Sequence, residues 1–294
     1  MTSPHTHESY AVLEQVTQTV GIGVEGAEPI RLAENDIWRL PGRVVVRIAR
    51  PGQEAAAAKE VAVTRWLSRC GVPAVRPLDI EQPITVDGRA ATFWEELPPH
   101  RAGDSSNLAP LLRQLHGLPK PSFKLDEMDP FVRVAGRIKA ARSVNEDDQT
   151  WLLRRLEDLK EAWRDLPTGL PQCVIHGDAW GGNVAVTANG DVLLDFERSA
   201  YGFPEWDLTS TAVAADTFGK VSGTAYANFC EAYGHDVMKW AGYPVLRSVR
   251  ELRLVSFAFQ TADQDPSMSD QAFYRLACIR GHHGPRPWQW QAVA

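Results

Sequence analysis

The sequence lacks several features that would place the protein in other classes. It has no block rich in Lys and Arg, and its net charge of -6 argues against a nucleic-acid-binding surface. No uninterrupted apolar run approaches the length that crosses a bilayer, so no membrane partner is expected. The segment Met1–Tyr10 is polar and has no apolar core of a secretory signal. We therefore predict a soluble protein of the cytoplasm.

Cysteine is scarce, and the spacing of the cysteines matches no metal-binding motif. The four cysteines are scattered along the chain without metal-site spacing, which favours ordinary reduced thiols: Cys70, Cys173, Cys230 and Cys278. The length of 294 residues, of which 44% are hydrophobic, suffices for one large or two small domains with a real core.

The most informative stretch is Cys173–Leu208. It contains C-V-I-H-G-D-A-W-G-G-N-V-A-V, a short turn, V-L-L-D-F-E and then Y-G-F-P-E-W-D-L. Short apolar runs at Val184–Val186 and Val192–Leu194 flank an Asn189–Gly190 pair. An Asn-Gly pair between two such runs predicts a β-hairpin.

Three oxygen-bearing side chains surround this predicted hairpin. Asn183 precedes it and Asp195 follows it, and the two ends of a hairpin are neighbours. Asp178 lies five residues before Asn183, in a glycine-rich loop that can bend back toward both. Two carboxylates and an amide oxygen suit a hard divalent cation. The alternative is a surface hairpin whose acidic residues are merely solvated.

The first hundred or so residues are predicted to form short strands and two helices. Helices are expected at Ser9–Val20 and Gln53–Ser68, and strands at Ile30–Leu32, Ile37–Leu40, Val44–Ala49, Ile84–Val86 and Ala90–Trp94. The Pro98–Pro99 pair then marks a linker. From Asn107 onward the pattern is mainly helical, at Leu108–His116, Phe131–Ser143, Trp151–Leu166, Asp207–Thr217, Val221–Gly234, Pro244–Asp263 and Ser267–Ile279.

In order and spacing these motifs resemble the aminoglycoside phosphotransferase family, which also includes choline, sugar and other small-molecule kinases. His176-Gly177-Asp178 stands where protein kinases carry H-R-D, and Asp195-Phe196-Glu197 where they carry D-F-G. The resemblance implies an α+β, two-lobed protein-kinase-like fold. Residues 1–97 would form a small nucleotide-binding lobe, an antiparallel sheet with a helix. Residues 98–294 would form a larger, mainly helical catalytic and acceptor-binding lobe.

The resemblance also implies roles for the loop residues of that stretch. Asp178 would accept or orient the proton of the acceptor hydroxyl, and Asn183 and Asp195 would hold Mg2+. His176 would brace the loop by packing, and Glu197 would support the metal shell. Asp207 would receive backbone N–H groups of the loop, and it could also be the N-cap of a helix.

For the nucleotide, the resemblance implies a set of contacts from the first lobe. Arg47 would grip the non-transferred phosphates where protein kinases use Lys, and Glu60 would pair with it. The remaining expected contacts are the phosphate-covering turn Ala33, Glu34 and Asn35, and the purine-facing backbone near Glu95 and Leu97. The alternatives are an edge-strand Arg, a solvated helix Glu and an ordinary hairpin turn.

The acceptor has no readable signature. From Arg247 to the end there are six arginines and four acids, whereas a pocket for polycationic aminoglycosides should be lined with carboxylates. His116 is expected to pack beside leucines rather than to act as an acid or base. Trp288 and Trp290 are expected to seal the core rather than to cover an apolar ring of the acceptor.

The predicted activity is transfer of the γ-phosphoryl group of ATP or GTP to a hydroxyl of a small molecule, with Mg2+. An aminoglycoside or other antibiotic is the first candidate acceptor, and a sugar, amino alcohol or related metabolite is the alternative. A catalytically silent nucleotide-binding regulator would lack one of the three key oxygen ligands, and all are present. The protein is expected to be a monomer or weak homodimer.

Overall fold

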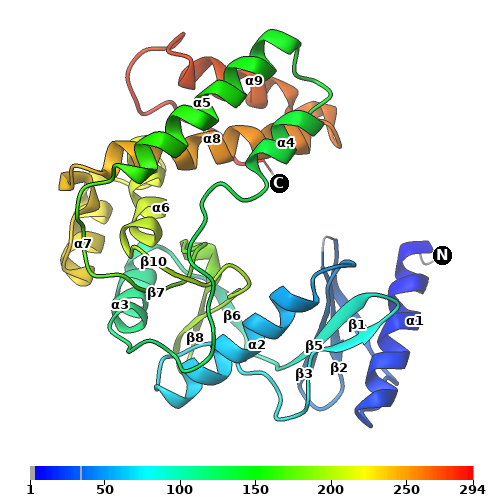
Figure 1. The fold of residues 1–294 in the computed structure, drawn as a ribbon. Helices are drawn as coiled ribbons and strands as arrows, with labels where there is room; N and C mark the ends of the chain where they lie inside the picture. Colours follow the sequence, from blue (N-terminus) through cyan, green and yellow to red (C-terminus); the bar gives the residue numbers. More distant parts are fainter. Residues whose placement is uncertain (1–3, 34, 294) are drawn as a thin grey trace. The chain divides into compact units, whose positions relative to one another are not determined.

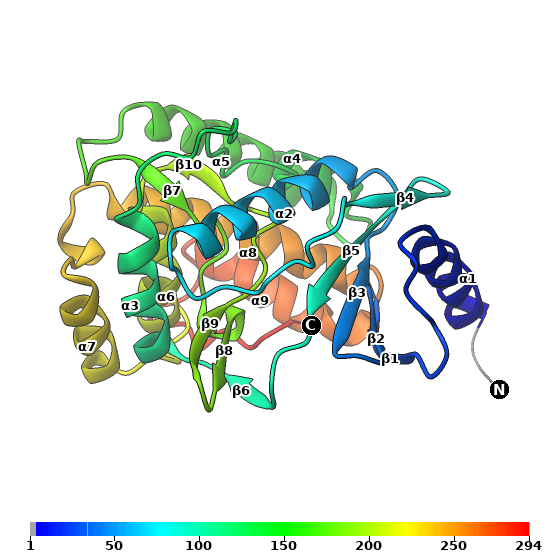
Figure 2. The same ribbon diagram turned by 90° about the horizontal axis from the view of Figure 1, so that it is seen from below.

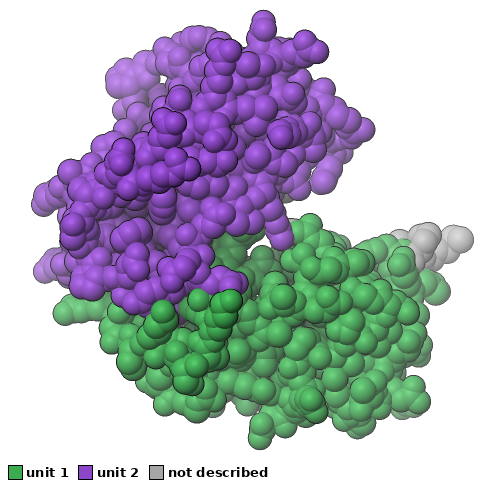
Figure 3. All heavy atoms as spheres, viewed as in Figure 1, with its two compact units in different colours: residues 1–125, 176–200 green, residues 126–175, 201–294 purple. Residues whose placement is uncertain are grey.

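The computed structural model describes residues 4–33 and 35–293, and the chain divides into two compact units. The first unit comprises Met1–Leu125 and His176–Ala200, and the second comprises Asp126–Ile175 and Tyr201–Ala294 (Figure 3). The chain therefore leaves the first unit after Leu125, returns at His176 and leaves again after Ala200. These units do not divide at Leu97, and the functional boundary expected there stays a prediction.

The first unit contains a five-stranded antiparallel sheet of order β1-β2-β3-β5-β4. Its strands are β1 (Glu28–Leu32), β2 (Asp36–Leu40), β3 (Val44–Ile48), β4 (Ile84–Val86) and β5 (Arg89–Glu95). The β4–β5 turn is the two residues Asp87 and Gly88, with φ values of 50° and 70°. Positive φ at both positions is what a type I′ hairpin turn requires, as the Asp-Gly pair predicts.

The alternation of side chains along these strands gives the sheet two different faces. One face packs on helix α1 (Pro4–Thr19) and forms a buried apolar core with it: Val12, Leu13, Val16, Trp38, Leu40, Val46, Ile48, Ala91 and Phe93. The intervening positions, including Val45, Arg47 and Trp94, point to the opposite face and line a groove. Figure 2 shows α1 beside the sheet.

Helices α1 and α2 of this unit differ slightly from the sequence prediction. Helix α1 begins at Pro4 rather than Ser9, because proline is well suited to the first turn of a helix. Helix α2 runs from Glu54 to Arg69, with the buried Glu60 in its middle.

A second, three-stranded sheet of order β6-β8-β9 completes the first unit. It consists of β6 (His100–Ala102), β8 (Val184–Thr187) and β9 (Gly190–Leu193). Helix α3 (Ser105–His116) follows β6 and begins with a capping box, in which Asp104 accepts from the Ser106 N–H. The segment after the double proline is thus tied to the hairpin that carries Asn183 and Asp195.

The second unit is mainly helical (Figure 1). Its helices are α4 (Val134–Ala140), α5 (Glu146–Arg164), α6 (Glu205–Asp216), α7 (Gly223–Tyr233), α8 (Tyr243–Ala262) and α9 (Ser269–Ile279), with short 3₁₀ turns at Val237–Lys239 and Pro266–Met268. Strand β7 (Cys173–Ile175) pairs with β10 (Ala200–Gly202). In the described part of the chain, no helix combines the length and apolar character needed to span a membrane.

Two details of this unit bear on the predictions. Helix α6 begins at Glu205 with Pro204 as its N-cap, so the N-cap interpretation of Asp207 is wrong, and Asp207 lies fully buried in the first turn. Trp290 is completely buried and Trp288 almost so, which confirms that these side chains seal the core.

Candidate active site

The β8–β9 hairpin brings Asn183 and Asp195 together as predicted. Val184 pairs with Leu193, and the Leu194 N–H donates to the Asn183 carbonyl at 2.9 Å. The turn differs from the expected one, because Thr187 pairs with Gly190 and the two loop residues are therefore Ala188 and Asn189.

The loop before the hairpin is held by its own side chains. The Asn183 amide Nδ2 donates to the Asp178 carbonyl at 2.9 Å, which fixes the short Gly181–Asn183 3₁₀ turn against the start of the loop. His176 is fully buried, and its Nδ1 accepts from the Asp178 N–H at 3.3 Å. Its Nε2 therefore carries the proton that is donated to the Leu194 carbonyl at 2.8 Å. His176 thus connects the loop to the end of the hairpin.

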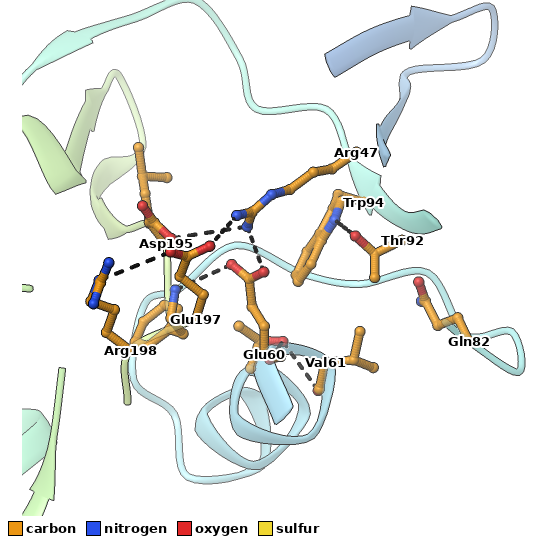
Figure 4. Close-up of polar contacts among 12 residues, drawn as sticks. Arg47, Glu60, Val61, Gln82, Thr92, Trp94, Asp195, Glu197 and Arg198 are labelled. Carbon is orange, nitrogen blue, oxygen red and sulfur yellow. Dashed lines mark hydrogen bonds and ion pairs between the residues drawn. The ribbon is translucent and has the colours of Figure 1, made fainter. Parts of the chain in front are cut away.

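Arg47 is the centre of an ion-pair cluster within the first unit (Figure 4). Its Nη1 lies 2.6 Å from Oε2 of Glu60, and its Nη2 lies 2.6 Å from Oε2 of Glu197. The second oxygen of Glu60 accepts from the Phe196 N–H at 3.2 Å. Glu60 therefore joins the strand that carries Arg47 to the segment that follows Asp195.

Carboxylates outnumber cations in this cluster. Burial raises the pKa of Glu60 to about 7, although the charge of Arg47 works in the opposite direction. Burial and the charge of Glu197 likewise raise the pKa of Asp195, against the attraction of Arg47. Arg47 faces three carboxylates, and Arg198 adds one further cation, 4.0 Å from Glu197. Since three carboxylates still outnumber two guanidinium groups, an additional positive charge would stabilise the ionised site.

Asp195 has the free oxygen that a cation would need. Its Oδ1 is buried and has no hydrogen-bond partner among the described residues, and the nearest Arg47 nitrogen lies 3.9 Å away. Asp195 also has a positive φ of 60°, an uncommon conformation for a residue other than glycine. Within residues 4–33 and 35–293 there is no group of three or more His, Cys, Asp or Glu side chains in a metal-binding arrangement. Asp195 and the amide oxygen of Asn183, which line the same groove, could hold an ion that keeps water and phosphate ligands.

A groove of about 950 Å³ in the first unit collects most of the predicted nucleotide contacts. Its lining includes Asn35, Arg47, Glu60, Glu95, Leu97, Asn183 and Asp195, together with apolar walls from Val45, Val75, Trp94 and Leu194. A lining that combines charged and apolar side chains suits a ligand with a charged and an apolar part.

The groove does not account for every predicted site residue. Ala33 and Asp178 are not among its lining residues, and Glu34 lies outside the described residues. Asp207 belongs to the second unit, so its predicted contact with the loop stays a prediction.

Two features of the site were missed at the sequence level. Glu197 was expected only as a possible support for the metal, yet it is the second ion-pair partner of Arg47. The two residues lie 150 positions apart, so no local pattern could have paired them. Trp180 lies in the loop between Asp178 and Asn183, and its side chain is 56% exposed.

The chain matches a model of the phosphotransferase enzyme family over residues 27–251. Ketosamine-3-kinase from Mus musculus is 32% identical over 95 residues, which cover 32% of this chain and 27% of that protein.

Similar solved structures extend over nearly the whole chain. Amicoumacin kinase hAmiN, in complex with AMP-PNP, Ca2+ and Ami, has a TM-score of 0.72 at 14% identity, covering 95% of this chain and 97% of that chain. A choline/ethanolamine kinase family protein from Mesorhizobium loti has a TM-score of 0.63 at 19% identity, covering 94% of each chain. These likenesses confirm the predicted protein-kinase-like α+β fold.

Proposed function

Because this chain belongs to the phosphotransferase enzyme family, we propose that it transfers the γ-phosphoryl group of ATP or GTP to a hydroxyl of a small molecule. The observation that carries the proposal is the groove that brings Arg47, Glu60, Asn183 and Asp195 to one place. These side chains come from separate parts of the sequence, and together they match the parts that phosphoryl transfer needs for positioning and charge neutralisation.

Each of the site residues has a role in this mechanism. Arg47, held by Glu60 and Glu197, binds the phosphates that are not transferred. Asp178 accepts the proton of the acceptor hydroxyl as the hydroxyl oxygen attacks the γ-phosphorus. The bond from the γ-phosphorus to the bridging oxygen breaks, and nucleoside diphosphate leaves. Asn183 and Asp195 would hold Mg2+, which would neutralise charge on the phosphates. Asn35, Glu95 and Leu97 line the part of the groove left for the nucleotide.

For the acceptor we propose an antibiotic first, an aminoglycoside or another natural product. Support comes from the likeness over the full length to amicoumacin kinase, whose structure contains AMP-PNP, Ca2+ and Ami. A metabolic kinase for a sugar or amino alcohol is the second candidate, supported by the local similarity to ketosamine-3-kinase and the likeness to a choline/ethanolamine kinase family protein. Either acceptor uses the same transfer chemistry.

The test is a nucleotide-consumption screen with ATP and GTP, with Mg2+, over antibiotics, sugars and amino alcohols. At least one acceptor should raise consumption above the background of nucleotide alone. With that acceptor, Asp178→Ala should lower kcat by at least about 100-fold, because a positioned general base contributes about that much.

The control is Asp87→Asn, which changes an exposed carboxylate in the β4–β5 turn and should leave kcat unchanged. The Asp178→Ala variant should still bind nucleotide, which is measured as a rise in its melting temperature when nucleotide is added. If Asp178→Ala turns over normally, the proposed base is wrong. If no acceptor raises consumption, a nucleotide-binding protein without transferase activity is the better description.

A further inference from the structure

Trp180 is the most exposed large hydrophobic side chain among the described residues, at 56%. Its neighbours in the loop, Ala179 and Asn183, are buried, so neither adds exposed surface beside the indole. Protein partners usually need a contiguous apolar surface of several hundred Å². An isolated indole in water is unfavourable for folding, and it suits a small ligand better than a protein surface.

The indole is not loosely attached, because its ring lies over the backbone of Gly182. A Cβ atom built on Gly182 would lie 2.1 Å from Cη2 of Trp180, so any larger residue there would displace the ring. The peptide of Trp180 is also fixed, since its carbonyl accepts from the Asn183 N–H at 2.9 Å. One ring face is therefore packed on glycine, and much of the remaining ring surface is open to solvent.

The loop beneath the indole is itself closely packed. A Cβ atom on Gly181 would lie 2.7 Å from both Cα of Asp104 and the Gly103 carbonyl, at the start of helix α3. The position of Trp180 is thus set by backbone contacts before any ligand arrives. An aromatic surface fixed in advance loses little conformational entropy upon binding.

Trp180 follows the proposed base, Asp178, by two residues, and two residues of chain span at most about 7 Å. The main chain of Trp180 is therefore next to that of Asp178. An acceptor that binds at Asp178 lies beside the loop position that carries the indole. Aromatic side chains attract the flat face of another ring through dispersion and apolar burial.

We propose that Trp180 is the stacking surface for the acceptor, and that the acceptor presents a flat apolar ring face next to the hydroxyl that is phosphorylated. This inference rests on the proposed function. A sugar ring and an aromatic ring share this chemistry. The proposal excludes acyclic amino alcohols and acyclic polyols as the preferred acceptors.

The test uses steady-state kinetics on the full chain with four variants. Trp180→Phe keeps a flat ring, Trp180→Leu keeps apolar bulk without a ring, and Trp180→Ala removes both. Gly182→Ala keeps the indole side chain but displaces its ring from the contact with Gly182. Gly182 does not have a positive φ, so alanine fits the backbone there. The acceptors are matched pairs: methyl glucoside with sorbitol, benzyl alcohol with hexanol, and aminoglycosides with acyclic amino alcohols.

Ring acceptors should be phosphorylated with higher kcat/KM than their acyclic partners. Trp180→Leu, Trp180→Ala and Gly182→Ala should raise the KM for the ring acceptor about tenfold, equivalent to about 1.4 kcal/mol. The acceptor KM of Trp180→Phe should stay within about threefold of the wild-type value, since phenylalanine keeps a flat aromatic face for stacking. The KM for nucleotide should not change in any of the four.

Other outcomes are distinguishable. Preference for acyclic acceptors, or an unchanged acceptor KM in Trp180→Ala, overturns the stacking role and leaves the transferase proposal standing. A rise in the nucleotide KM instead of the acceptor KM would mean that the indole contacts the nucleotide. This outcome also overturns the stacking role proposed for the acceptor. If neither wild type nor any variant phosphorylates an acceptor while nucleotide still binds, the proposed function fails first, and this inference fails with it.

Discussion

At the scale of single residues, Arg47 is unusual in sharing its guanidinium between two carboxylates. Glu60 binds one end and Glu197 binds the other, each at 2.6 Å, and the Arg47 side chain is only 17% exposed. A guanidinium held at both ends keeps its orientation, which matters for a group that must meet phosphate oxygens in a fixed geometry. Glu197 is therefore a positioning residue in the proposed mechanism.

We expect Glu197→Ala to raise the KM for nucleotide about tenfold, because a hydrogen bond to a charged group is worth about 1.5 to 3 kcal/mol and its loss leaves Arg47 mobile. Glu197→Gln should show a smaller rise, since an amide oxygen still accepts from Arg47. The KM for the acceptor should be the same in both variants. An unchanged nucleotide KM in Glu197→Ala would mean that Glu60 alone positions Arg47.

At the scale of elements, helix α1 is fastened to the sheet by a buried carboxylate as well as by apolar packing. Asp36, at the start of β2, is fully buried, and it lies 2.6 Å from Arg89 and 2.9 Å from His5 of α1. Burial disfavours its charge, but hydrogen bonds from Arg89, Ser9 and His5 outweigh burial and lower the pKa of Asp36.

Asp36→Asn should lower the free energy of unfolding by about 2 kcal/mol at pH 7, through weakened hydrogen bonds to charged groups. A carboxylate whose pKa is lowered in the folded state stabilises the fold above its unfolded pKa, here 3.8, and loses that effect as pH falls through the folded pKa. The difference between wild type and Asp36→Asn should therefore be constant from pH 7 to 5 and shrink below pH 3.8.

Urea unfolding at several pH values measures this difference. Asp87→Asn serves as the control, because Asp87 is exposed and asparagine tolerates its positive φ of 50°. A difference that grows toward low pH would contradict the proposed role of the Asp36 carboxylate.

The elements also show what the sequence could and could not predict. Periodicity and turn residues located the hairpins, α2 and most helices of the second unit, because those signals are local. The three-residue strands β6 and β7 escaped, because no turn signal joins them to a neighbour and their pairing partners lie far along the chain. The equally short β4 was located by the Asp-Gly turn that joins it to β5. For the same reason the Arg47–Glu60 pair was predicted from a family resemblance, and the Arg47–Glu197 pair was not predicted.

At the scale of the whole molecule, the C-terminal segment is part of the core of the second unit. Arg286 makes two hydrogen bonds to the buried Glu251, at 2.7 and 2.8 Å, and its guanidinium lies 4.0 Å from the centre of the Trp288 ring. Trp290 is fully buried and packs edge-on against Phe218, with ring centres 5.7 Å apart. The last residues therefore contribute to stability although they carry no predicted catalytic group.

Trp290→Ala should lower the free energy of unfolding by about 3 to 5 kcal/mol, the usual effect of removing a large aromatic side chain from a core. That is a large share of the roughly 5 to 15 kcal/mol that stabilises a typical domain. Urea denaturation followed by circular dichroism measures the change, with Phe273→Ala as the control because that side chain is 40% exposed. A loss below about 1 kcal/mol would show that the segment is dispensable.

The chain's departure from the first unit and its return have a consequence for synthesis on the ribosome. Arg47 and its partner Glu197 are 150 residues apart, and residues 126–175 of the other unit are made between them. At a synthesis rate of about 5 to 20 residues per second, roughly 8 to 30 s pass between the synthesis of Arg47 and that of Glu197. During that interval the β3–β5 sheet must persist without the β8–β9 hairpin and without the second carboxylate. A nascent chain stalled before residue 176 should therefore bind nucleotide far more weakly than the released protein.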